Sequence, residues 1–286
     1  MNTTSIYKSP EGEREIMTVY DATLARWPVP YDALRLPTRH GETFVIASGE
    51  KAAPPLVLLH GANSNATAWI GDVVQYSRAF RVYAVDILGE PGKSAPNRPA
   101  WDSPAYAEWL QDVLDALKIQ KTALLGISQG GWTALKFATA NPERVAKLVL
   151  LTPGGVVPTK PSFLLRAIVL SMMGRRGAEA INRIVFGKQP IHPDAVKFMN
   201  IIMTNFRARI EAEQIFSDEA LKRLTMPTLL LGGMQDALRP NDKIAARMKK
   251  WMPNLTAILI PGVGHVLHNT AAQVMPFLTA TEGQTT

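Results

Sequence analysis

A single serine between two glycines constrains this chain more than any other feature. Residues 124–132 (LLGISQGGW) begin as an apolar strand and end as the start of a helix. A serine at the tip of so sharp a turn crowds the backbone two positions before it and two positions after it. Only a residue without a Cβ atom fits easily there, and Gly126 and Gly130 occupy those positions. The pattern predicts that the hydroxyl of Ser128 is presented at the end of a strand.

The flanking residues favour a reactive serine over an ordinary Gly-rich turn. Gly-x-Ser-x-Gly alone would occur by chance in about one chain in ten of this length. Here residues 121–125 (KTALL) are typical of a short buried strand, whereas residues 132–138 (WTALKFA) are helical and stop at Asn141-Pro142. The order of strand, serine and helix is the context in which such a serine acts as a nucleophile.

The size and composition of the chain exclude several classes of protein. Its 286 residues are 47% hydrophobic, which suffices for one large core with a subdomain. The longest apolar runs fall short of the roughly 18 residues that a membrane-spanning helix needs. The absence of cysteine excludes disulfides and thiolate metal sites. Because the first residues also lack an apolar signal core, we expect a cytoplasmic protein.

The net charge of +7 does not by itself indicate a nucleic-acid or membrane partner. The basic residues are dispersed, with only pairs such as Arg175-Arg176 and Lys249-Lys250. No basic stripe interleaved with aromatic residues occurs, so we expect no nucleic-acid binding. The oligomeric state is left open, a homodimer included.

Strand and helix patterns alternate along most of the chain, with short links between them. This rhythm predicts a parallel sheet with right-handed crossovers. Alternating apolar residues and a turn at 39–42 predict a hairpin before it. The expected strands of the parallel sheet are 56–59, 81–86, 121–125, 145–151, 228–233 and 256–260.

The rhythm breaks between residues 153 and 225, where helical patterns occur and no clear strand does. The expected helices there are 163–173, 178–185, 193–206 and 215–224. We interpret 153–225 as an inserted helical cap, because one crossover rarely needs so many residues; further crossover helices are the alternative. We expect residues 1–30 to form an N-terminal helical appendage, and 31–152 with 226–286 to form the core. Met172 and Met203 of the cap are candidate substrate contacts, or else core filler.

A serine hydroxyl needs a base in contact with it, and the base needs an acid that fixes its tautomer. Reactive side chains gather at the carboxyl ends of parallel strands. Asp236 follows the strand at 228–233, and His265 follows the strand at 256–260. We therefore predict that Asp236 is the acid and His265 the base. Asp242, near a helix start, is a rival acid, and His268 is a rival base or a substrate contact.

The oxyanion formed during acyl transfer needs two backbone N–H donors. One is expected from Gln129, directly after the serine at a helix start, and the other from Ala62, in the loop after the strand at 56–59. Asn63 is expected to contribute to this site or to bond the leaving group, and Trp132 is a further candidate substrate contact. His60 is interpreted as a structural histidine that braces the loop.

Together these motifs resemble the α/β-hydrolase superfamily over residues 43–280. They are His60-Gly61-Ala62-Asn63, the loop 86–94, the elbow 126–131, Asp236 and Gly264-His265. The resemblance implies an α/β fold with an eight-stranded, mostly parallel sheet, helices on both faces and a cap inserted after the sixth strand. The N-terminal helix and residues 7–12 (YKSPEG) are similar to the bacterial carboxylesterase NP group.

The chain also departs from related patterns. Ser128 argues against dehalogenases and epoxide hydrolases, which use an aspartate nucleophile. The lipase signature His-Gly-Gly-Gly is absent, and Glu90-Pro91 replaces the usual small residues of the loop that begins at Asp86, so we expect a different rim to the site.

The expected activity is hydrolysis of small to medium hydrophobic carboxylic esters through an acyl-enzyme. No metal or organic cofactor is needed for that reaction. Alternatives with the same triad are a carbon–carbon bond hydrolase, a lactonase or a cofactor-free perhydrolase. A non-enzymatic small-molecule sensor on this fold is the alternative from another class.

Overall fold

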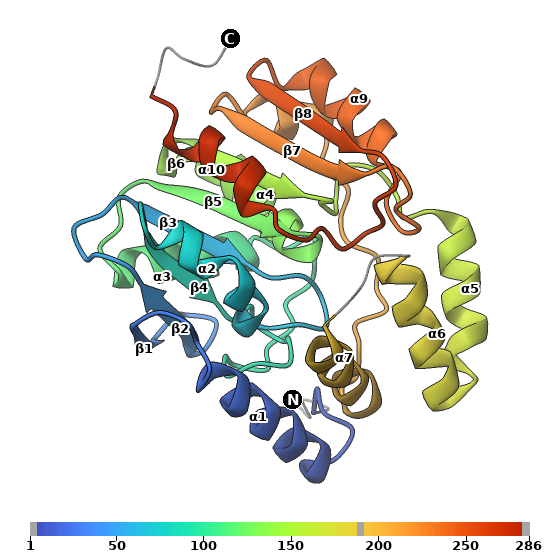
Figure 1. Cartoon of the computed structure of the whole chain (residues 1–286). Helices are drawn as coiled ribbons and strands as arrows, with labels where there is room; N and C mark the ends of the chain where they lie inside the picture. Colours follow the sequence, from blue (N-terminus) through green and yellow to red (C-terminus); the bar gives the residue numbers. More distant parts are fainter. Residues whose placement is uncertain (1–4, 188–191, 282–286) are drawn as a thin grey trace.

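The computed structural model describes residues 5–187 and 192–281, and within them eight strands form one sheet (Figure 1). The strands are β1 Tyr31–Leu36, β2 Thr43–Ser48, β3 Pro55–Leu59, β4 Arg81–Val85, β5 Thr122–Ile127, β6 Val145–Leu151, β7 Thr228–Gly233 and β8 Leu255–Ile260. Their spatial order is β1-β2-β4-β3-β5-β6-β7-β8. The β1–β2 and β2–β4 pairs are antiparallel and the remaining pairs are parallel. This sheet confirms the predicted fold class.

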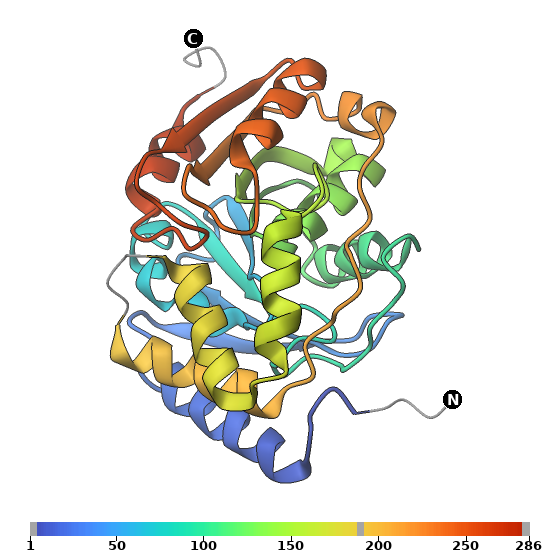
Figure 2. The ribbon, with the colours of Figure 1, turned by 90° about the vertical axis from the view of Figure 1, so that its right-hand side faces the viewer.

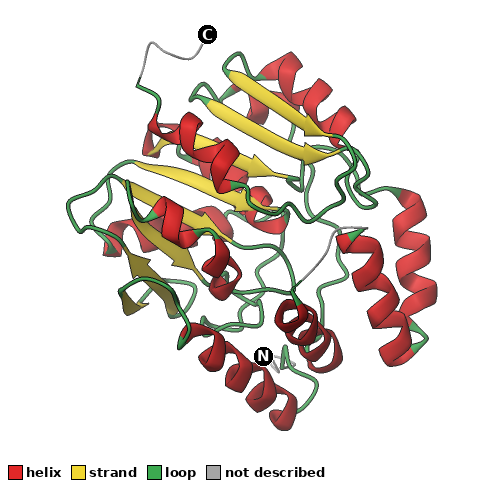
Figure 3. Cartoon of the chain, in the orientation of Figure 1, coloured by secondary structure: helices red, strands yellow, loops and turns green. Residues whose placement is uncertain are grey.

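Helices cover both faces of the sheet (Figure 3). They are α1 Pro10–Leu24, α2 Val73–Tyr76, α3 Ala105–Ala116, α4 Gln129–Ala140, α5 Pro161–Ser171, α6 Gly174–Phe186, α7 Pro193–Asn205, α8 Asp218–Lys222, α9 Asn241–Trp251 and α10 Ala271–Thr279. Strand β6 shows how the two cores form. Leu148 and Leu150 pack in the core of α3, α4 and α9, whereas Val149 and Leu151 pack in the core of α2 and α10. Successive side chains of a strand point to opposite faces, so a continuous apolar run fills both cores.

Between β3 and β4 the chain forms a 3₁₀ turn over Ala66–Gly71 and then the single turn α2. The last helix expected in the cap is confined to α8, where the Ser217 side chain accepts a hydrogen bond from the Ala220 N–H. The residues before α8 form an irregular extended segment along the core. The Trp132 indole N–H holds this segment in place by donating to the Gln214 carbonyl.

The segment between β6 and β7 carries α5, α6, α7 and α8. Figure 2 shows α5 and α6 side by side, and their packing is a direct helix–helix contact. α5 buries none of its residues. Most of its large apolar side chains are exposed, as are those of the two residues that follow it: Leu164, Leu165, Ile168, Val169, Met172 and Met173.

The N-terminal segment packs against this inserted region as well as against the sheet. Helix α1 lies along α7, and a Cβ built on Gly12 would come within 2.8 Å of Asn205 Cβ. Ile16 and Ile202 are buried between the two helices. The Tyr20 hydroxyl reaches the core and donates to Asp86. Residues of α1 therefore connect the core to helix α7.

None of the helices formed by residues 5–187 and 192–281 combines the length and the apolar character that crossing a bilayer requires.

Candidate active site

Ser128 stands on a strained turn between β5 and α4. Its backbone has φ 52° and ψ −110°, a combination that costs energy for a residue with a Cβ. The two flanking glycines make the turn possible. A Cβ on Gly126 would lie 2.3 Å from the Gly130 carbonyl oxygen, and a Cβ on Gly130 would lie 2.1 Å from the Leu59 carbonyl oxygen. The close approaches predicted from the sequence are therefore present.

The backbone of Ser128 is anchored on both sides. Its N–H donates to the Leu151 carbonyl at 2.9 Å, and its own carbonyl accepts the Gly154 N–H at 3.0 Å. Both partners belong to the end of β6 or the loop after it. Ser128 as a whole is 8% exposed, so it is buried at the carboxyl edge of the sheet.

Asp236 and His265 form a hydrogen-bonded pair beside this turn. Oδ2 of Asp236 lies 2.8 Å from Nδ1 of His265, and both side chains are buried. Their loops follow the neighbouring strands β7 and β8. The Gln235 N–H donates to the Val263 carbonyl, which ties one loop to the other.

Asp236 is held as an ionised carboxylate. Burial alone would raise its pKa, but the bond to His265, the charge of that imidazole and the N–H groups of Leu238 and Arg239 outweigh burial. The pKa therefore lies below its usual range. Asn241 donates a further hydrogen bond to Oδ2 at 3.1 Å. An anion fixed in this way keeps the proton of His265 on Nδ1 and leaves Nε2 free to accept one.

Ser128 and His265 are both hydrogen-bonded to the backbone or side chains at the end of β6. The Ser128 N–H bonds to Leu151, and the hydroxyl of the next residue, Thr152, donates to the His265 carbonyl at 3.4 Å. Among the described residues, no hydrogen bond joins Ser128 Oγ to the imidazole. In enzymes of this kind that contact is often long without substrate and tightens when substrate binds.

The loop after β3 approaches Ser128 from the opposite side. A Cβ built on Gly61 would lie 3.7 Å from Ser128 Cβ. His60 braces this loop, as predicted, because its Nδ1 donates to the Gly61 carbonyl and its Nε2 accepts the Ile87 N–H. Burial lowers the pKa of His60 to about 4, so the ring is neutral, and both of its nitrogens are bonded to backbone groups.

The two predicted oxyanion donors lie at the ends of adjacent strands. Ala62 follows β3 and Gln129 follows β5, and Leu59 pairs with Gly126 in the sheet. In the part of the chain that the structure describes, neither N–H donates to another protein group. The Asn63 N–H differs, because it donates to Glu90 at 2.7 Å. Asn63 therefore offers only its side chain to a ligand in this arrangement.

Glu90 is a residue of the site whose role was not predicted. It is 4% exposed, and its two carboxylate oxygens accept from the Asn63 N–H and from the Gln129 side-chain amide at 3.0 Å. The sequence flagged Glu90-Pro91 only as an unusual pair at the rim. Burial raises the pKa of Glu90 to about 7, against the opposing effects of Gln129, Asn63, Arg98 and Arg209.

The rival acid and base are exposed. Asp242 lies in the first turn of α9, and the structure pairs His265 with Asp236 instead. His268 lies on the surface, where its charge acts on Asp72.

The proposed substrate contacts are placed differently from one another. Trp132 is wholly buried with Trp101, Tyr106 and Phe216, which corrects the prediction that it contacts substrate. Its indole is a core side chain. Met172 is 83% exposed directly after α5. Met203 lies half-buried on α7. The substrate contacts of both methionines stay predictions.

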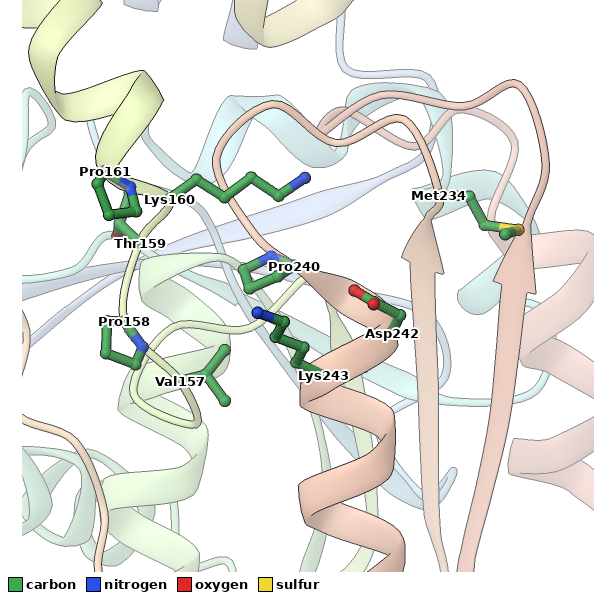
Figure 4. Close-up of a pocket in the computed structure, with 9 residues that line it drawn as sticks. All are labelled: Val157, Pro158, Thr159, Lys160, Pro161, Met234, Pro240, Asp242 and Lys243. Atoms are coloured by element: carbon green, nitrogen blue, oxygen red, sulfur yellow. The ribbon is translucent and has the colours of Figure 1, made fainter.

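A cavity of about 590 Å³ borders the Asp236 loop (Figure 4). It is lined by Val157, Pro158, Thr159, Lys160, Pro161, Met234, Pro240, Asp242 and Lys243. None of these is Ser128, His265 or Ala62, so the cavity lies beside the reactive groups. Lys160 connects the two regions, because its ammonium group donates to the Asp236 carbonyl at 2.6 Å.

No cluster of three or more His, Asp or Glu side chains that could hold a metal ion occurs within residues 5–187 and 192–281.

The fold and the serine turn define an α/β-hydrolase. Residues 56–276 match the model of the alpha/beta hydrolase family, and the chain belongs to that family. It is 35% identical over 268 residues to the uncharacterized carboxylesterase nap of Bacillus subtilis, an alignment that covers 91% of this chain and 88% of the relative. It is 31% identical over 264 residues to the carboxylesterase YbfK of the same species, with 87% and 86% covered.

Solved structures agree with these relatives. The crystal structure of naproxen esterase (carboxylesterase NP) from Bacillus subtilis matches with a TM-score of 0.86 at 31% identity, covering 95% of this chain and 99% of that one. The comparisons confirm the predicted fold class and the predicted resemblance to bacterial carboxylesterases. They identify the chain as an enzyme of the hydrolase class.

Proposed function

We propose that this protein is a serine hydrolase that cleaves carboxylic esters, with Ser128 as nucleophile, His265 as base and Asp236 as acid. The observation that carries the proposal is the buried 2.8 Å hydrogen bond between Asp236 and His265 at the carboxyl edge that also holds Ser128. The carboxylesterase relatives support the ester bond as the target.

The first half of the reaction transfers the acyl group to the enzyme. Ser128 Oγ attacks the acyl carbon while its proton passes to Nε2 of His265. Asp236 accepts the Nδ1–H of the same ring and stabilises the imidazolium that forms. The tetrahedral intermediate then collapses, the bond to the alcohol oxygen breaks, and that oxygen leaves with the proton from His265.

The negative charge of each tetrahedral intermediate is assigned to the N–H groups of Ala62 and Gln129. Backbone donors fixed before the reaction stabilise such a charge without reorganising, which makes them effective. Gln129 is also the first residue of α4, and the positive end of the helix dipole favours an anion there.

The second half releases the acid and restores the enzyme. Water attacks the acyl carbon and gives a proton to His265. The bond to Ser128 breaks, and Ser128 Oγ takes that proton back. The products are one carboxylic acid and one alcohol, and the steps use only protein groups and water.

The inserted helices support a small to medium hydrophobic substrate. Apolar side chains dominate α5, and most of the large ones are exposed and so available to contact an apolar substrate. Burying such a surface against an apolar acyl or alcohol group is favourable by about 25 cal/mol for each Å².

Three further expectations stay predictions. Sedimentation tests the homodimer, cell fractionation tests the cytoplasmic location, and a DNA-binding assay tests the absence of nucleic-acid binding.

The test is steady-state hydrolysis of p-nitrophenyl esters of increasing acyl length, with Ser128→Ala beside the wild type. We expect turnover that falls by at least about a thousandfold in the variant. The acyl length with the largest kcat/KM measures the size of the acyl pocket. A folded wild type could leave these esters intact but cleave a vinylogous 1,5-diketone. That result would mean that Ser128, His265 and Asp236 catalyse carbon–carbon bond hydrolysis instead.

A further inference from the structure

Glu90 is a buried carboxylate to which the reaction above gives no role. It lies in the loop between β4 and α3, in a tight turn where the Gly92 N–H donates to its carbonyl at 2.8 Å. Gly89 makes the turn possible with φ 72°, and a Cβ there would lie 2.6 Å from the Asn97 carbonyl oxygen. A carboxylate is costly to bury, so its contacts need an explanation.

The carboxylate bridges the two chain segments that carry the oxyanion donors. Oε2 accepts the Asn63 N–H at 2.7 Å, and Oε1 accepts the Gln129 side-chain amide at 3.0 Å. The Asn63 N–H belongs to the peptide plane directly after Ala62, and Asn63 has a strained φ of 54°. The bond to Glu90 therefore fixes the backbone on the C-terminal side of Ala62. The second bond ties Gln129 to the same carboxylate.

We propose that Glu90 is a positioning residue of the oxyanion hole: its carboxylate holds the Ala62 loop and the start of α4 at the spacing that a tetrahedral intermediate requires. The inference rests on the serine-hydrolase function proposed above. A backbone donor stabilises an oxyanion only when it lies at about 2.7–3.1 Å from the oxygen, so a small shift of either segment lowers the rate. Glu90 itself touches no reacting atom.

The charges around Glu90 make this device sensitive to pH. Arg98 and Arg209 bring positive charge to it, and its own charge acts on the phenols of Tyr106 on α3 and of Tyr7 in the N-terminal segment. From α4 it meets the uncharged Gln129. The carboxylate accepts from two donors, whereas the neutral acid carries a proton on one oxygen, which makes that oxygen a poorer acceptor. Protonation of Glu90 should therefore loosen the oxyanion hole.

The experiment compares Glu90→Gln with Glu108→Gln, the same change at a carboxylate of α3 that bonds His40 outside the site. For each, kcat and KM for a p-nitrophenyl ester are measured from about pH 5 to about pH 9. Active sites are counted with a phosphonate ester, and the Ki of a trifluoromethyl ketone is determined.

For Glu90→Gln we expect kcat for each titrated site to fall at least about tenfold, and the Ki to rise by a similar factor, because both depend on the oxyanion donors. KM should change less than about threefold. The acidic limb should change its position or steepness in Glu90→Gln and stay as in the wild type in Glu108→Gln. A limb remains in every variant because the base must be unprotonated to act. A Glu90→Gln enzyme with wild-type kcat for each titrated site and an unchanged limb would overturn the proposal, even if its Tm were lower.

A second measurement needs no turnover and so separates this inference from the proposed function. Amide ¹H–¹⁵N shifts of Ala62 and Gln129 are followed over the same pH range. In the wild type we expect both to titrate together near pH 7, and in Glu90→Gln neither should. Shifts that stay flat in the wild type would overturn the positioning role. If the wild type shows no ester turnover but both amide shifts titrate together, the proposed ester hydrolysis is rejected and the positioning role of Glu90 stands.

Discussion

The imidazole of His265 and the carboxylate of Asp236 meet at 2.8 Å although 29 positions separate them in the sequence. One glycine allows this approach. A Cβ on Gly233, at the end of β7, would lie 2.2 Å from the Gly264 carbonyl oxygen in the loop after β8. The hydrogen-bonded pair of Asp236 and His265 therefore depends on backbone packing between the two loops as much as on the two side chains.

Replacing Asp236 by Asn should lower kcat by about 10³–10⁴-fold while KM changes little. The amide cannot stabilise the imidazolium, and it favours the tautomer of His265 with the proton on the wrong nitrogen. The matched control is Asp242→Asn, an exposed carboxylate in α9, which should stay within about twofold of the wild type. Equal losses in the two variants would contradict the assignment of the acid.

The two histidines of the last loop offer a second matched pair. His265→Gln removes the group that is bonded to Asp236, so kcat should fall by at least about a thousandfold. His268→Gln changes an exposed ring, and we expect it to keep activity within about threefold. Measuring kcat for both variants in a stopped assay tests which histidine is the base. A larger loss of kcat in His268→Gln than in His265→Gln would reverse the assignment.

Gly130→Ala should unfold the elbow or lower the free energy of unfolding by about 3 kcal/mol or more. The new methyl group would lie 2.1 Å from the Leu59 carbonyl oxygen, and backbone cannot easily move away. Gly71→Ala is the control, because no atom lies within 4 Å of a Cβ at that position. Urea unfolding measures both, and similar free energies for the two variants would mean that the turn is not held as described.

The free energy of unfolding should fall as pH rises through neutrality, with Glu90 as a principal cause. Burial raises its folded-state pKa from 4.5 to about 7, so the folded state binds this proton more tightly than the unfolded state. The resulting stability is complete below about pH 4.5 and is lost as pH rises through about 7, an effect of about 3 kcal/mol.

Urea unfolding of the wild type and of Glu90→Gln over this range tests that sign. The two curves should diverge, with the variant gaining relative to the wild type as pH rises. Glu108→Gln should follow the wild type. Parallel curves for Glu90→Gln and the wild type would show that Glu90 does not titrate in the way that its burial requires.

The sheet, the elbow and the strand-end positions of Asp236 and His265 could be predicted because each depends on local signals. Apolar runs mark the strands, and glycines mark the close approaches around Ser128. Such signals follow from the residues within a few positions of the feature itself.

The contacts of Glu90 could not be predicted from local sequence signals. Its partners Asn63 and Gln129 lie 27 and 39 positions away, and only the neighbouring strands β3, β4 and β5 bring the three together. Trp132 fails for a related reason. Its place directly after the elbow suggested a substrate contact, but helix α4 turns that side chain towards Trp101 and Phe216 in the core.

The most direct test of the central claim is to identify the residue that becomes covalently modified. The protein is treated with diethyl p-nitrophenyl phosphate, the released p-nitrophenol is measured, and tryptic peptides are analysed by mass spectrometry. Cleavage after Lys121 and Lys136 gives the peptide 122–136, in which Ser128 is the sole serine. We expect about one p-nitrophenol for each chain and a diethylphosphoryl group on Ser128, with neither in Ser128→Ala. A folded wild type that is modified elsewhere, or not at all, would contradict Ser128 as the nucleophile.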